Sequence, residues 1–130
     1  MTGRFLKLER SDQAPAKARE WAAGLVAGFP HEARSDVVLL THELVTNAVR
    51  HSDGDRIWLA AVVTPEMIRV EVSDEGGVTE PVMLPQQPYA TSGRGLVWVD
   101  QLADGWGTEH ERASSVWFQI DLPSRTLTTA

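Results

Sequence analysis

Two hydrophobic periods follow one another along the chain. Alternating apolar and polar residues are typical of strands with one buried face, and apolar residues that recur every three or four positions are typical of helices. The alternating segments predict strands over residues 5–8, 57–63, 67–72, 105–109 and 115–122. The other segments predict helices over residues 14–23, about 32–50 and 96–102. The chain is therefore expected to form an α+β domain, with Ser11 and Asp12 capping the first helix.

A long segment between the third and fourth predicted strands breaks both periods. From Gly76 to Arg94 the composition changes to Gly, Pro, Gln, Thr and Ser, and the three prolines of this segment exclude regular structure. Segments of this length without helix or strand are uncommon in compact domains, where they usually serve as lids or binding loops. We therefore expect residues 76–94 to close over a ligand.

Length and charge exclude several classes of function. The 130 residues carry 12 Lys and Arg against 18 Asp and Glu, a net charge of -6. This length predicts a single domain, over residues 1–123, with a flexible tail over 124–130. The acidic balance argues against a broad basic surface, so neither nucleic acid nor a membrane is expected as a direct partner. Without Cys or a long apolar run, we expect a cytoplasmic protein with no disulfide and no thiolate site.

The second predicted helix carries a polar row beside its apolar stripe. The stripe consists of Val37, Leu40, Leu44 and Ala48, with Val45 and Val49 nearer its border. Glu43, Asn47 and Arg50 follow one another along its edge, and His51 projects between row and stripe. One interpretation is the solvated side of an amphipathic helix. The other is that Asn47 supplies an oxygen ligand to Mg²⁺ and that Glu43, one turn earlier, orients or deprotonates a nucleophile.

Two glycine clusters lie outside the predicted helices and strands. Asp74, Gly76 and Gly77 follow the third strand, either as a simple turn or as a base pocket in which Asp74 accepts a hydrogen bond from an exocyclic amine. Thr91-Ser92-Gly93-Arg94-Gly95-Leu96 opens the third helix, where backbone N–H groups can hold phosphate. Neither cluster is a Walker A loop or a dinucleotide fingerprint.

Taken together, the three blocks carry a family resemblance. Residues 43–51, then Asp74-Glu75-Gly76, then Gly93-Arg94-Gly95-Leu96, resemble in order and spacing the ATP-binding domain shared by gyrase, heat-shock chaperones and histidine kinases, the Bergerat fold. The chain is most similar to its small stand-alone branch, the anti-sigma factor serine/threonine kinases. The resemblance implies a two-layer α/β sandwich, with a mixed, mostly antiparallel sheet packed against three helices and an ATP lid.

The resemblance also implies roles for individual residues. Asn47 would bind Mg²⁺, Glu43 would be the general base or an orienting carboxylate, and Asp74 would recognise adenine. Ser115 matches a position whose hydroxyl supports that aspartate. The remaining ATP-binding residues would be Arg50, His51, Gly76, Gly77, Ser92, Gly93, Arg94, Gly95 and Leu96.

Two functions follow from these roles. The first is an ATP- and Mg²⁺-binding regulator that binds a sigma factor and phosphorylates Ser or Thr on an anti-sigma factor antagonist, with a homodimer expected from the family. The second is a module of the same fold that binds partners without phosphotransfer. It is favoured by Val78, which stands where the D-x-G-x-G box has its second glycine. We also expect Trp98 and Trp117 to occupy core positions.

Overall fold

The computed structural model describes residues 2–75, 99–109 and 115–122. The elements in chain order are β1 (Thr2–Glu9), α1 (Ala14–Leu25), α2 (His31–His51), β2 (Arg56–Val63), β3 (Met67–Asp74), β4 (Gly105–Glu109) and β5 (Ser115–Asp121). Residues 99–102 are helical as well, which confirms the described part of the helix expected over 96–102. The predicted lid over 76–94 and the tail over 124–130 lie outside the described residues.

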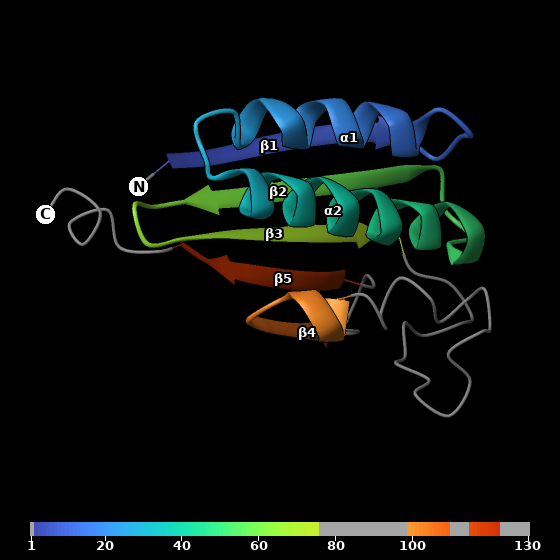
Figure 1. The fold of residues 1–130 in the computed structure, drawn as a ribbon. Helices are drawn as coiled ribbons and strands as arrows, with labels where there is room; N and C mark the ends of the chain where they lie inside the picture. Colours follow the sequence, from blue (N-terminus) through green and yellow to red (C-terminus); the bar gives the residue numbers. More distant parts are fainter. Residues whose placement is uncertain (1, 76–98, 110–114, 123–130) are drawn as a thin grey trace, which may run out of the picture.

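The strands form one five-stranded sheet in the order β1-β2-β3-β5-β4. All four pairings among the described strands are antiparallel, so the parallel pairing of a mixed sheet is not among them. Helices α1 and α2 lie side by side on one face of this sheet (Figure 1). The predicted α+β sandwich is therefore confirmed. In the described residues, no helix combines the length and apolar character that crossing a bilayer requires.

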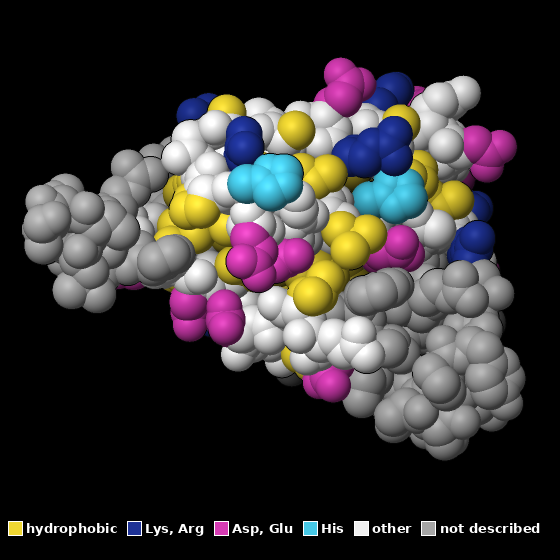
Figure 2. Space-filling view, viewed as in Figure 1, with side chains coloured by type: hydrophobic (Ala, Val, Ile, Leu, Met, Phe, Trp, Pro, Cys, Tyr) yellow, Lys and Arg dark blue, Asp and Glu magenta, His cyan; other side chains and the backbone are white. Residues whose placement is uncertain are grey.

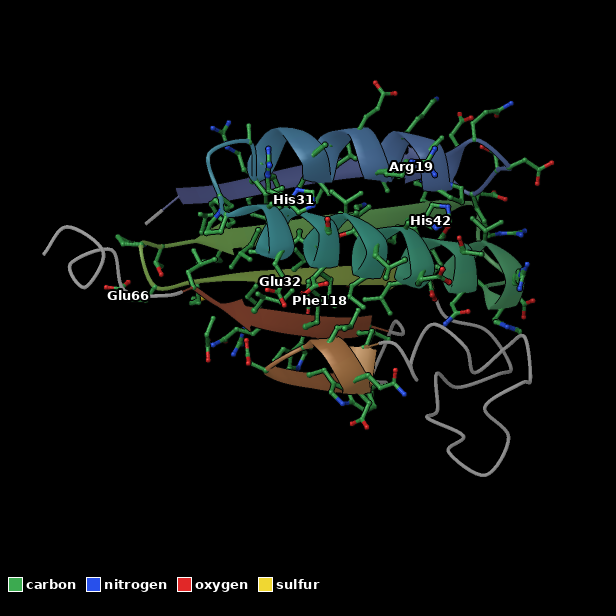
Figure 3. All side chains as sticks on the ribbon, viewed as in Figure 1. Arg19, His31, Glu32, His42, Glu66 and Phe118 are labelled. Carbon is green, nitrogen blue, oxygen red and sulfur yellow. The ribbon has the colours of Figure 1, made fainter. Side chains whose placement is uncertain are left out.

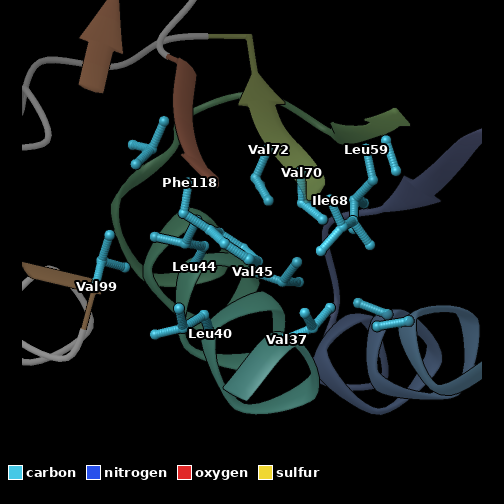
Figure 4. Packing of buried hydrophobic residues seen from close by; sticks show 14 of the residues in the cluster. Val37, Leu40, Leu44, Val45, Leu59, Ile68, Val70, Val72, Val99 and Phe118 are labelled. Carbon is cyan, nitrogen blue, oxygen red and sulfur yellow. The ribbon is translucent and has the colours of Figure 1, made fainter. Parts of the chain in front are cut away.

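The core lies between the sheet and α2, as the two hydrophobic periods require. On β3, Ile68, Val70 and Val72 point toward the helices, and Phe118 of β5 extends the same layer (Figure 4). The stripe of α2 faces them. Val45, expected near its border, is fully buried, so the stripe is broader than the sequence suggested. Burial of each such side chain stabilises the fold by roughly 1.5–3 kcal/mol.

The start of α1 differs from the prediction. Gln13 is the N-cap residue, and no side chain caps the helix. Ser11 instead forms a turn before the helix, because its hydroxyl accepts a hydrogen bond from the Gln13 N–H at 3.3 Å and its carbonyl accepts one from the Ala14 N–H at 3.1 Å. The expected capping role of Ser11 and Asp12 is therefore wrong.

The second face of the sheet carries Trp117, which corrects its expected core position. Trp117 is half-buried and packs over the glycines of β4, since a Cβ at Gly107 would lie 2.7 Å from the indole Nε1. The Arg69 guanidinium stacks on its ring at 4.2 Å. Trp117 thus covers edge-strand glycines rather than filling the core. Trp98 lies outside the described residues.

Candidate functional site

The predicted polar groups lie at one end of the molecule. Helix α2 runs in the same direction as β3, so the C-terminal half of α2 and the end of β3 lie at the same edge (Figure 1). The turn over residues 52–55 leads from α2 into β2 at this edge. The hairpin turn between β2 and β3, which includes Glu66, lies at the opposite edge (Figure 3). Glu43 and Asn47 on α2 are therefore brought toward Asp74 at the end of β3.

The polar row of α2 is partly buried rather than solvated along its length. Glu43 and Asn47 are half-buried, and the Glu43 side chain is 23% exposed. Arg50, one turn further along, is exposed. The His42 Nδ1 lies 4.0 Å from the Glu43 Oε1, an ion pair only when the imidazole is protonated. The Glu43 carboxylate and the Asn47 amide are one helical turn apart. Their side-chain oxygens, which can bind a metal ion, therefore lie at the border between α2 and the sheet.

His51, the last residue of α2, carries an orphaned polar atom. Its Nε2 is buried and has no hydrogen-bond partner among the described residues. A buried imidazole nitrogen without a partner is costly, and such atoms in native structures commonly face a ligand, an ion or water. The imidazole of His51 therefore fits a polar ligand at this end of α2, such as a phosphate oxygen.

Asp74 lies on the side of the sheet that faces the helices. It pairs with Ile57, a core residue, and follows Val72 by two positions, so it shares their face. The Asp74 side chain is half-buried at the strand end. This is a suitable place for a carboxylate that accepts a hydrogen bond from a flat base entering beside α2.

Ser115 lies on the opposite face from Asp74. It pairs with Ser73, whose side chain points away from the helices because successive residues of a strand alternate. Its hydroxyl donates a hydrogen bond of 3.0 Å to the Glu71 Oε2. The sequence expectation that Ser115 supports Asp74 is therefore corrected, because the register of β3 and β5 places the two side chains on different faces.

Two residues to which the sequence analysis gave no role, Arg10 and Glu75, contact the turn that follows α2. Glu75 accepts hydrogen bonds from two backbone N–H groups of this turn, and Arg10 donates to two carbonyls of the same region. The partners are 19 to 44 positions apart in the chain. Each of the two residues directly follows an observed strand, β1 (Thr2–Glu9) or β3 (Met67–Asp74), whereas the predicted strands ended at residues 8 and 72, so the sequence pattern did not identify them.

The remaining predicted residues lie outside the described part of the chain. They are Gly76, Gly77, Ser92, Gly93, Arg94, Gly95 and Leu96, together with Val78. Within the described ranges, no group of three or more His, Asp or Glu side chains is arranged to hold a metal ion. The donor set suits Mg²⁺ carried by phosphates, since this ion keeps several waters and takes few protein ligands. Asn47 fits such a ligand.

The surface on the side of the helices, shown in Figure 2, has no broad region of one charge in its described part, which favours a small local binding site. Acidic, basic and histidine side chains are interspersed over its described part (Figure 2). His42 lies on this helix-covered side (Figure 3). A polyanionic ligand would therefore depend on groups at the end of α2 and β3 rather than on a basic surface.

Comparison with known proteins agrees with this arrangement. A search among curated proteins gives no match. One similar solved structure is the crystal structure of the RsbU and RsbW domains of Rv1364c from Mycobacterium tuberculosis, with a TM-score of 0.71 at 18% identity. The match covers 96% of this chain but 34% of that chain, and at this identity it establishes the fold alone. The model of the histidine kinase-like ATPase domain matches residues 7–119. The chain therefore belongs to the family of histidine kinase-like ATPase domains, which bind ATP.

Proposed function

We propose that this protein is an ATP- and Mg²⁺-dependent regulator that binds a sigma factor and phosphorylates Ser or Thr on an antagonist of that binding. The observation that carries the proposal is the placement of Glu43 and Asn47 at the same end of the molecule as Asp74. The family match supports ATP as the ligand, and the RsbW domain in the similar structure supports the regulatory class.

Asp74 recognises the base in this proposal. Its half-buried carboxylate accepts a hydrogen bond from the exocyclic amine of adenine. Guanine carries a carbonyl oxygen at the corresponding position, which cannot donate to a carboxylate. The protein is therefore expected to prefer ATP over GTP.

Asn47, Glu43 and His51 act at the phosphate end. The Asn47 side-chain oxygen holds Mg²⁺, which when bound neutralises charge on the phosphates and orients the γ-phosphoryl group. The orphaned Nε2 of His51 faces a phosphate oxygen. Glu43 accepts the proton of the attacking hydroxyl, to which its side chain, 23% exposed, is accessible.

Nucleotide binding is tested by calorimetric titration with ATP and GTP, with and without Mg²⁺. We expect ATP to bind and Asp74→Ala, which removes the acceptor, to weaken ATP binding strongly while leaving GTP binding unchanged. Asn47→Ala should remove the gain in affinity that Mg²⁺ provides. Glu20→Gln, an exposed substitution on α1, is the control. Failure of the wild-type protein to bind ATP would refute the proposal.

Phosphotransfer is tested with ATP labelled on the γ-phosphate and candidate antagonist proteins. Label should appear on Ser or Thr of one antagonist, and Glu43→Gln should reduce the transfer rate about a hundredfold or more, the range of a lost general base, with ATP affinity retained. Equal transfer by Glu43→Gln would remove the assigned role of Glu43.

A second function is favoured by one sequence feature. Val78 stands where the D-x-G-x-G box has its second glycine, and a valine there would weaken the base pocket that the family resemblance implies. In this case the protein binds its partners without phosphotransfer, and the binding does not depend on ATP. Pull-down of a sigma factor that is equal with and without ATP, combined with no label transfer, would favour this alternative.

A further inference from the structure

Glu75 holds the turn that joins α2 to β2. Its Oε1 accepts hydrogen bonds from the Asp55 N–H at 2.6 Å and from the Arg56 N–H at 2.8 Å. One carboxylate oxygen thus satisfies two consecutive backbone donors at the start of β2. Hydrogen bonds to an ionised acceptor are roughly twice as strong as those between neutral groups.

Arg10 binds backbone carbonyl groups of the same region. Its backbone N–H donates to the Asp55 carbonyl at 2.7 Å, and its Nε donates to the Gly54 carbonyl. Its Nη1 donates to the Val49 carbonyl at 3.1 Å, in the last turn of α2. This carbonyl belongs to the group that a helix end leaves without partners, and a cation there also interacts favourably with the helix dipole.

Gly54 lets Glu75 approach the turn closely. A Cβ at position 54 would overlap with the Cβ of Glu75 and lie 2.7 Å from its Cδ. The Gly54 N–H donates to the Ser52 hydroxyl at 3.1 Å, which folds the turn locally. The turn is therefore fitted to the Glu75 side chain and not merely adjacent to it.

These contacts join the two halves of the proposed nucleotide site. Glu75 directly follows Asp74, the proposed base-recognising residue, and Arg10 contacts the helical turn that follows Asn47. Both charged side chains act on the turn over residues 52–55. The spacing between the base end and the phosphate end therefore depends on this turn, which directly follows His51 at the phosphate end.

We propose that Glu75, supported by Arg10, is a positioning residue that sets Asp74 relative to α2 and thereby the affinity and base selectivity of nucleotide binding. The inference rests on the proposed function, because it assigns Asp74 to the base and Asn47 to the phosphates. Glu75 itself contacts the turn, so its effect on nucleotide is indirect.

The test compares Glu75→Ala with Glu75→Gln in fluorescence titrations of ATP and GTP well below the unfolding temperature. Alanine removes the acceptor, whereas glutamine keeps an oxygen that can receive both N–H groups. We expect Glu75→Ala to weaken ATP binding about tenfold, within the usual range for residues that orient a ligand-binding group indirectly. The ratio of ATP to GTP affinity should fall with it, and Glu75→Gln should restore both.

The control is Glu66→Ala, an exposed carboxylate in the hairpin turn at the opposite edge of the sheet (Figure 3). Circular dichroism shows whether each variant is folded at the titration temperature. If Glu75→Ala does not fold there, Arg10→Lys, which keeps the charge but loses the guanidinium geometry, carries the test. A ratio of ATP to GTP affinity that is unchanged in Glu75→Ala, or in Arg10→Lys where Glu75→Ala does not fold, would overturn the inference while ATP binding by the wild type upheld the proposed function. No ATP binding by the wild type would overturn both.

Discussion

At the scale of single residues, the unusual groups on α2 are two buried polar atoms that have no hydrogen-bond partner among the described residues. His51 Nε2 lies at the site, but the Thr41 hydroxyl lies in the middle of the helix, where Thr41 is fully buried. Thr46, a turn away, satisfies its own hydroxyl by donating to the His42 carbonyl at 2.8 Å. Two threonines of one helix therefore differ in whether burial of the hydroxyl is compensated.

Thr41→Val should stabilise the protein. Valine has the same shape, and it replaces a buried hydroxyl that has no hydrogen-bond partner among the described residues, so we expect a gain of about 1 kcal/mol in the free energy of unfolding. Thr46→Val is the matched control and should show no gain, because it removes a formed hydrogen bond. Urea denaturation measures both; a loss of stability in Thr41→Val would show that the hydroxyl has a partner in solution.

At the scale of elements, the first half of α2 carries an electrostatic cost. Desolvation by burial raises the pKa of Asp36 above its ordinary value of 3.8, and the negative charges of Glu32 and Asp104 raise it further. The folded state therefore binds a proton more tightly than the unfolded state does. Stability contributed by this group falls as the pH rises from the ordinary pKa through the raised one, and the full cost remains at neutral pH.

Asp36→Asn should accordingly stabilise the protein at pH 7. The gain should shrink as the pH is lowered and vanish below the ordinary pKa of 3.8, where Asp36 is neutral in both states. Thermal unfolding of wild type and variant between pH 3 and pH 8 measures this difference. Glu20→Gln, on the exposed side of α1, should show no such trend. A difference that is constant over the pH range would contradict the electrostatic origin.

The turn between α2 and β2 is sensitive to a single methyl group. Gly54→Ala places a Cβ against the Cβ of Glu75, so the turn or the end of β3 must shift, at a cost of about 1–3 kcal/mol. Gly24→Ala is the matched control, because nothing lies near its added Cβ and the helix gains stability from alanine. Glu75→Gly should relieve part of the loss in Gly54→Ala. Chemical denaturation of Gly54→Ala, Gly24→Ala, Glu75→Gly and the double variant of Gly54→Ala with Glu75→Gly tests whether overlap with Glu75 is the cause.

At the scale of the whole molecule, α2 and β3 contribute both to the hydrophobic core and to the proposed nucleotide site. Glu43 and Asn47 belong to the C-terminal half of α2 and Asp74 ends β3, and these two segments lie at the same end of the molecule (Figure 1). Ligand that binds the folded state alone must therefore stabilise the whole domain. The gain in the free energy of unfolding depends on the ligand concentration relative to the dissociation constant and not on the number of contacts.

ATP with Mg²⁺ should raise the unfolding temperature of the wild-type protein. At a ligand concentration one hundred times the dissociation constant, the gain is about 2.7 kcal/mol. The same concentration should give little or no shift in Asp74→Ala, which lacks the acceptor for the adenine amine. Differential scanning fluorimetry over a series of ATP concentrations measures the effect, and an equal shift for ATP and GTP would argue against base recognition by Asp74.

Much of this architecture follows from local pattern. Strands and helices were predicted within a few residues because alternation and helical spacing reflect burial on one face, and β4 (Gly105–Glu109) matches its predicted range. The polar row of Glu43 and Asn47 was visible for the same reason. Their positions on one helix are fixed by its period alone.

Tertiary structure decided the features that depend on how distant segments meet. The pairing of β3 with β5 places Ser115 on the face opposite to Asp74, and the pairing of β5 with β4 lays Trp117 over the glycines of β4. The turn after α2 draws Arg10 and Glu75 together from 44 positions before it and 20 after it. Local periodicity determines which side of an element is buried, but the register between elements determines which side chains meet, because a shift of one residue moves each side chain to the other face.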